Sequence, residues 1–215
     1  FTGTMTNDGG GRDVEIRSDV AAGKKVEFTG NLDLEDRNYY VSGDGVVEFS
    51  GDISGTVDDR SSMNRSDDGD GMLILSGTNT HVGGTNVGGG VIKFDSPAAM
   101  SPAVLSTSGE GVIGLTFDFD RPVVWGSPGD GDVNLSSGGG FAAYGADRTV
   151  NFGGAGAQVG MGGGSGFLGN MEESYLVLGH STADATVTIV NPISVGGSIS
   201  EAPNIWQWKV KDGSA

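Results

Sequence analysis

Three stretches repeat one pattern: Val26-Glu27-Phe28-Thr29-Gly30, Val47-Glu48-Phe49-Ser50-Gly51 and Leu73-Ile74-Leu75-Ser76-Gly77. Each has apolar residues at alternate positions, followed at once by a small polar residue and a glycine. Alternate side chains of a β-strand point to the same face, and Ser, Thr and Gly let the backbone turn. Weaker versions of the pattern occupy 92–95, 112–115, 133–136, 150–153, 176–179 and 187–191. The pattern predicts short strands that each end at a tight corner.

The spacing of these strands predicts how they are arranged. The last inward residues of the first eight are Phe28, Phe49, Leu75, Phe94, Leu115, Leu135, Phe152 and Leu178, at steps of 21, 26, 19, 21, 20, 17 and 26. Steps of roughly 20 residues suit one coil of a parallel β-helix, in which each coil stacks its strands on the previous coil. We therefore expect an all-β parallel β-helix (β-solenoid) of about ten irregular coils, on the order of 50 Å long. An antiparallel β-sandwich is the alternative, because some intervals contain a second weak strand, such as 83–87.

The composition narrows the class of protein. The chain has 215 residues, of which 41 are Gly, and a formal net charge of −16. Such an acidic surface repels nucleic acid and anionic lipid, so neither is expected as a partner. No apolar run reaches the roughly 18–20 residues of a membrane span, so membrane insertion is not expected. The absence of Cys fits an exported bacterial protein that does not depend on disulfides.

Residues 71–95 carry a resemblance to a known family. Their order of Leu75-Ser76-Gly77, Asn79-Thr80 and Gly83-Gly84-Thr85 resembles the autotransporter-associated β-strand repeat. The chain departs from the family pattern at His81, where the family has Tyr, and at Gly90-Val91, where Gly-Thr is usual. Neither change touches the glycines of the turns.

The resemblance implies a secreted, extracellular protein of the bacterial cell surface, and it brings no catalytic residues with it. We therefore expect a structural, non-enzymatic rod or fibre segment that could also be adhesive. A carbohydrate-binding adhesin module is the first alternative, and a polysaccharide-active enzyme on a β-helix scaffold is the second. Both ends, at Phe1 and Ala215, read as mid-repeat sequence, so 1–215 is interpreted as one solenoid segment of a longer chain or filament. Uncapped strand edges recruit other chains, which predicts self-association end to end or packing on flanking repeats.

The candidate metal site is an aspartate cluster in a glycine-rich loop. Asp67, Asp68 and Asp70 are closely spaced around Gly69 and Gly71. Hard cations such as Ca²⁺ prefer carboxylate oxygens on a loop that can wrap the ion. The cluster lacks the Glu that closes a twelve-residue calcium loop, so a solvated acidic corner remains the other interpretation. Calcium is the only cofactor for which the sequence offers a candidate, and none is required. Asp130 and Asp132 form a second, weaker cluster.

Two other patterns are candidates for ligand chemistry. Trp206 and Trp208 share one face of a predicted strand and could stack on sugar rings, unless they pack in the last coil. Asp118 and Asp120 alternate with Phe117 and Phe119, a spacing that suits either paired catalytic acids or a strand with buried aromatics and exposed acids. His81 and His180, the only histidines, are expected at polar loop positions.

Overall fold

The chain folds into a β-solenoid of parallel strands. The computed structural model describes residues 13–57, 60–66, 69–124, 127–154, 156–161, 166–167, 175–194 and 207–211. Every ladder between named strands in this part is parallel, and the one antiparallel contact is an isolated bridge between Ala143 and Ala185. The predicted parallel β-helix is therefore confirmed, and the antiparallel sandwich is wrong. No helix among these residues is long and apolar enough to cross a membrane.

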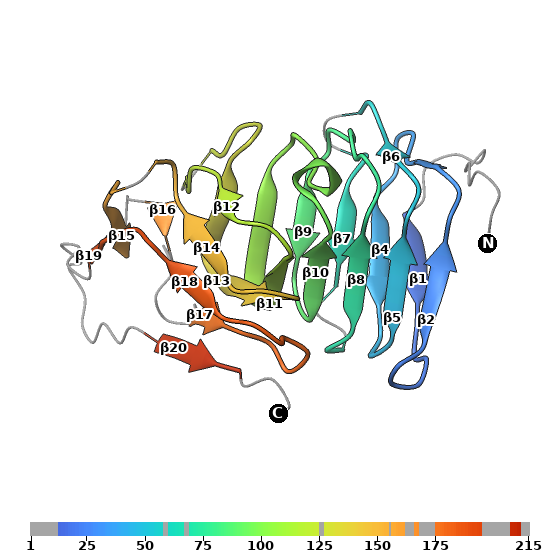
Figure 1. Cartoon of the computed structure of the whole chain (residues 1–215). Helices are drawn as coiled ribbons and strands as arrows, with labels where there is room; N and C mark the ends of the chain where they lie inside the picture. The colour runs from blue at the N-terminus through green and yellow to red at the C-terminus, as the bar shows by residue number, and fades with distance from the viewer. Residues whose placement is uncertain are drawn as a thin grey trace.

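Three faces make up each coil. The first face contains β2 (Lys25–Phe28), β5 (Val46–Phe49), β8 (Met72–Leu75), β10 (Val91–Phe94), the C-terminal parts of β11 (Leu105–Leu115) and β13 (Val133–Ala143), β17 (Tyr175–Leu178) and β20 (Gln207–Val210). The second contains β1 (Val14–Arg17), β4 (Tyr39–Ser42), β7 (Met63–Arg65), β9 (Thr85–Val87) and the N-terminal parts of β11 and β13. Through β13 it continues to β16 (Gly166–Phe167), β15 (Val159–Met161) and β19 (Ile193–Ser194). Because β11 and β13 extend over both faces, the two faces form one 15-stranded sheet (Figure 1).

The third face is less regular. It pairs β3 (Leu32–Asp33) with β6 (Ile53–Ser54), and further along the solenoid β12 (Phe119–Asp120) with β14 (Arg148–Asn151) and β18 (Val187–Ile189). Between these two small sheets the chain forms a 3-10 turn, η1 (Pro97–Ala99), which is capped at its N-terminus by Ser96.

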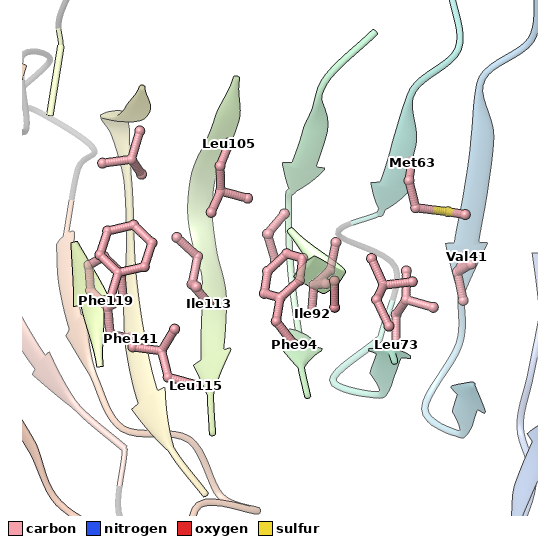
Figure 2. Close-up of a cluster of buried hydrophobic side chains, with 14 of the residues drawn as sticks. Val41, Met63, Leu73, Ile92, Phe94, Leu105, Ile113, Leu115, Phe119 and Phe141 are labelled. Atoms are coloured by element: carbon pink, nitrogen blue, oxygen red, sulfur yellow. The ribbon is translucent and has the colours of Figure 1, made fainter. Parts of the chain in front are cut away.

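Apolar side chains from successive coils stack in register inside the solenoid. Phe28 pairs with Phe49, Phe49 with Leu75, Leu75 with Phe94 and Phe94 with Leu115. The rings of Phe28 and Phe49 stack with their centroids 4.8 Å apart, one rung of a sheet. Figure 2 shows the neighbouring core, in which side chains from successive strands point toward one another. The first five positions of the predicted ladder are therefore confirmed.

The last three positions of that ladder are wrong. Leu135 lies on the second face, and Phe152 follows β14 on the third. Leu178 lies on the first face but pairs with Phe141, whereas Leu115 pairs with Ala143, two residues further along β13. The coils lengthen here, because Leu115 pairs with Ala143 and Leu178 with Val210. Fewer coils than the predicted ten therefore fit in the described chain, and eight strands lie on the first face.

The corners explain why the repeated stretches end in glycine. A Cβ placed on Gly51 would lie 2.3 Å from the carbonyl oxygen of Gly30, and one on Gly77 would lie 2.2 Å from that of Gly51. No side chain fits at such a distance, so the backbone of each coil rests directly on the corner below it. Two residues after Gly77, buried Asn79 accepts a hydrogen bond from the backbone N–H of Ile53 and donates one to the carbonyl of Ala99. One side chain thereby connects three successive coils.

Candidate functional site

The predicted calcium loop is only partly visible. Asp67 and Asp68 lie outside the described residues, so calcium binding there stays a prediction. Asp70 Oδ1 lies 3.1 Å from His180 Nε2 and 3.3 Å from Lys211 Nζ. Burial by itself would raise the pKa of Asp70, but His180 and Lys211 bring it below its usual value. Asp70 therefore joins the third coil to two segments far along the chain, and no metal-binding group of three or more acidic, His or Cys residues occurs in the described part.

Both histidines are buried, which the sequence did not predict. His180 Nδ1 accepts a hydrogen bond from the backbone N–H of Thr182 at 3.2 Å, so its Nε2 carries the proton that faces Asp70. Burial lowers the pKa of His180, although the charge of Asp70 acts in the opposite direction. Thr182 Oγ1 also forms a hydrogen bond with the hydroxyl of Tyr144, at 2.8 Å. These contacts fix the loop after β17 against the solenoid.

His81 lies in the loop between β8 and β9. Its side chain is buried, and Nε2 lies 2.9 Å from Thr85 Oγ1. Burial lowers the pKa of His81 to about 4, so the ring is neutral at physiological pH. Both histidines lie in loops, as the sequence predicts, but each ring is buried and has a neighbouring threonine as a hydrogen-bond partner.

Asp118 and Asp120, the candidate catalytic pair, lie on the solvent side of the third face, and the aromatic residues that alternate with them face the core. Phe119 is buried and Phe117 packs against the core, whereas Asp118 and Asp120 are exposed. Asp118 Oδ1 accepts a hydrogen bond from the backbone N–H of Thr149, which holds the pKa of Asp118 below its usual value. Asp118 therefore accepts a backbone hydrogen bond from the next coil. In the second cluster, Asp132 Oδ2 accepts a hydrogen bond from the N–H of Gly129 and closes its own loop.

The last described strand exposes apolar side chains. Trp208 is 50% exposed and Val210 is 75% exposed. They pair with Leu176 and Leu178, which face the core, so Trp208 and Val210 continue the core side of the sheet. On the other side of β20, Lys209 and Lys211 form ion pairs with Glu110. Trp206 lies outside the described residues, and the paired-indole sugar site stays a prediction.

A groove of about 840 Å³ lies over the second face and the corner that leads from it to the first face. Tyr40, Asn64 and Asn86 line it from β4, β7 and β9, and Glu110 and Lys211 line it from β11 and the end of β20. A smaller hollow of about 340 Å³, lined by Asp13, Glu15, Tyr40 and Ser66, adjoins it. The sequence gives no local signal of this groove, because its lining comes from five separate coils.

Buried Arg65 supports one wall of the groove. Its guanidinium donates hydrogen bonds to the carbonyls of Val41 and Gly43 in the coil below, at 3.1 and 2.5 Å. It also donates to the carbonyls of Ser66, Gly69 and Gly71 within the acidic corner. Charged donors satisfy backbone carbonyls strongly, so Arg65 fixes this corner without a regular strand. The sequence alone predicts only a metal site at this corner, from Asp67, Asp68 and Asp70, and gives no sign that Arg65 holds the corner together.

Comparison with known proteins gives one match. Residues 68–93, which contain β8, β9 and all but the last residue of β10, match the family model of the passenger-associated-transport-repeat. No curated protein and no solved structure matches the chain. The match confirms the family resemblance, and this repeat is a passenger repeat, not an enzyme family. The chain therefore carries one passenger-associated transport repeat, which suggests a segment of an autotransporter passenger, a surface protein.

Proposed function

We propose that this chain is a rod-forming structural segment of a secreted bacterial surface protein, and that its function is mechanical. The observation that supports this proposal most directly is the register of the first face, where parallel strands pair without interruption from β2 to β20. Each coil adds backbone hydrogen bonds and core contacts to the one before it. The stability of the rod is then a sum over coils and the contacts between neighbours, instead of depending on a single central core.

The end of the sheet supports association between such segments. Within the described residues, β20 pairs only with β17, and Trp208 and Val210 extend the core side of the sheet into solvent. Exposed apolar side chains on an edge strand favour the addition of another strand. At the opposite end, Val26 and Phe28 of β2 are only half-buried. We propose that the first coil of a second copy covers β20, so that copies stack end to end.

Two measurements test the proposal separately. Negative-stain electron microscopy should show elongated particles, and a compact sphere would contradict the rod. Light scattering should show a molar mass that rises with protein concentration and that falls to the monomer value in a Trp208→Lys, Val210→Lys variant. Val190→Lys is the matched control, since Val190 is 44% exposed but lies outside β20. A wild-type chain that stays monomeric at all concentrations would refute the stacking and leave the rod intact.

A further inference from the structure

The outward side chains of the second face form a row as regular as the core. Glu15 pairs with Tyr40, Tyr40 with Asn64, Asn64 with Asn86 and Asn86 with Ser106. The five positions occupy five adjacent strands and span about 19 Å at the usual strand spacing. Tyr40, Asn64 and Asn86 of this row line the groove, and Glu15 and Tyr40 line the adjoining hollow, so the two meet at Tyr40.

Hydrogen bonds hold the amides of this row in fixed orientations. Asn86 Nδ2 donates to Asn64 Oδ1 at 2.8 Å, and Asn64 Nδ2 donates to the carbonyl of Tyr39 at 3.1 Å. Ser106 Oγ donates to Asn86 Oδ1. Asn64 is buried, whereas Asn86 is exposed and keeps a second amide proton and a second lone pair for a ligand. A bound molecule would therefore meet an ordered donor and acceptor pair.

The chemistry of the lining selects a class of ligand. Tyr40 is half-buried, and its hydroxyl forms no hydrogen bond within the described residues. A tyrosine ring offers an apolar platform with a polar tip, which suits the alternating apolar faces and hydroxyl edges of a sugar chain. In the hollow, the carboxylates of Asp13 and Glu15 have no cationic partner within the described residues, so they can accept hydrogen bonds from hydroxyls and repel anions, whereas Asp70 and Glu110 of the groove are ion-paired with Lys211. Asp13 and Glu15 therefore disfavour uronic-acid and sulfated polymers at this end of the row.

We propose that this groove binds a neutral oligosaccharide, which lies across β1, β4, β7 and β9 with one ring on Tyr40 and hydroxyls bonded to Asn86. A linear polymer fits better than a compact ligand, because the row repeats its polar groups at each strand. This site is distinct from the predicted sugar site at Trp206 and Trp208, which stays a separate prediction. The proposal is tested separately from end-to-end stacking, because Tyr40 and Asn86 belong to the second face, whereas Trp208 and Val210 belong to the first.

An array of neutral linear oligosaccharides of glucose, mannose, galactose and N-acetylglucosamine, with uronic-acid and sulfated chains alongside, tests the proposal. We expect binding among the neutral chains, an affinity about tenfold lower in Tyr40→Ala, and most of the affinity retained in Tyr40→Phe. Asn86→Ala should also weaken binding. Trp208→Ala is the matched control, because it removes an exposed aromatic outside the groove and should leave the affinity unchanged.

Several outcomes would overturn the proposal. They are no binding to any neutral chain, a preference for acidic chains, or a loss of binding in Trp208→Ala with Tyr40→Ala unaffected. Displacement of the sugar by an extended peptide at similar concentration would assign the groove to a protein ligand instead. Circular dichroism melts of each variant separate a lost site from a lost fold, and Tyr40→Phe keeps the test valid if Tyr40→Ala unfolds.

Discussion

Replacement of Gly77 by Ala tests the close stacking of the corners. The added Cβ would lie 2.2 Å from the carbonyl oxygen of Gly51 and 2.5 Å from its carbonyl carbon. Ordinary van der Waals contact begins at 3.4 Å, so the two coils would have to separate locally by about 1.2 Å. That is a quarter of the usual spacing of about 4.8 Å between paired strands, too much for the neighbouring hydrogen bonds to absorb.

The expected cost follows from this displacement. Overpacking by a methyl group in a rigid interior costs about 1–3 kcal/mol, and the contact here is with backbone that cannot rotate away. We expect Gly77→Ala to lower the free energy of unfolding by about 3 kcal/mol or more. Gly51→Ala should behave in the same way, because its Cβ would lie 2.3 Å from the carbonyl oxygen of Gly30.

Urea denaturation monitored by circular dichroism measures the effect. Gly129→Ala is the matched control, since the nearest atom to its Cβ would be Asp132 Oδ2 at 3.7 Å. There the loss of backbone freedom in the unfolded chain should leave stability unchanged or raise it by up to about 1 kcal/mol. If Gly77→Ala proved as stable as Gly129→Ala, the coils would not stack through their corners as described.

Three further substitutions test other parts of the argument. Leu75→Asp should lower the free energy of unfolding by several kcal/mol and unfold the neighbouring coils, because an unpaired carboxylate replaces a fully buried side chain. An unchanged melting temperature would contradict the assignment of Leu75 to the core. Asn79→Ala should cost roughly 2–4 kcal/mol, since it leaves the N–H of Ile53 and the carbonyl of Ala99 without their partner, and a change below 0.5 kcal/mol would show that water replaces the amide. In the folded chain the pKa of His81 is about 4, below its unfolded value of 6.5. The neutral buried ring therefore contributes fully to folding stability above pH 6.5, and this contribution is lost as the pH falls toward 4. Stability should therefore fall by about 3 kcal/mol more in the wild type than in His81→Tyr over this range, and equal pH profiles in chemical denaturation would argue against a buried neutral ring.

The sequence predicts the early coils well because their pattern is local. From Phe28 to Leu115 each coil contributes one alternating stretch to the first face. The last apolar residue of one stretch therefore pairs with the last apolar residue of the next, and the register can be predicted from the sequence. That regularity fails at β13, where one continuous strand covers two faces and places Leu135 on the second. Sequence spacing cannot distinguish a longer coil from an extra strand. Contacts such as His180 with Asp70 are likewise absent from any local pattern, because 110 residues separate the partners.

The same register produces the rod and the candidate groove. A parallel ladder without shifts places equivalent residues above one another on both sides of the sheet, so stacking Met63 on Tyr39 inside also stacks Asn64 on Tyr40 outside. In the pairing of β11 with β13, the register shifts by one residue between Ser106 and Ser108 and shifts back between Gly109 and Val112, which interrupts such a row. An extended site is therefore expected along the regular coils that contain the transport repeat, not along the longer coils after β13. The many glycines contribute to both features, since they allow the close corner contacts that keep successive coils in register.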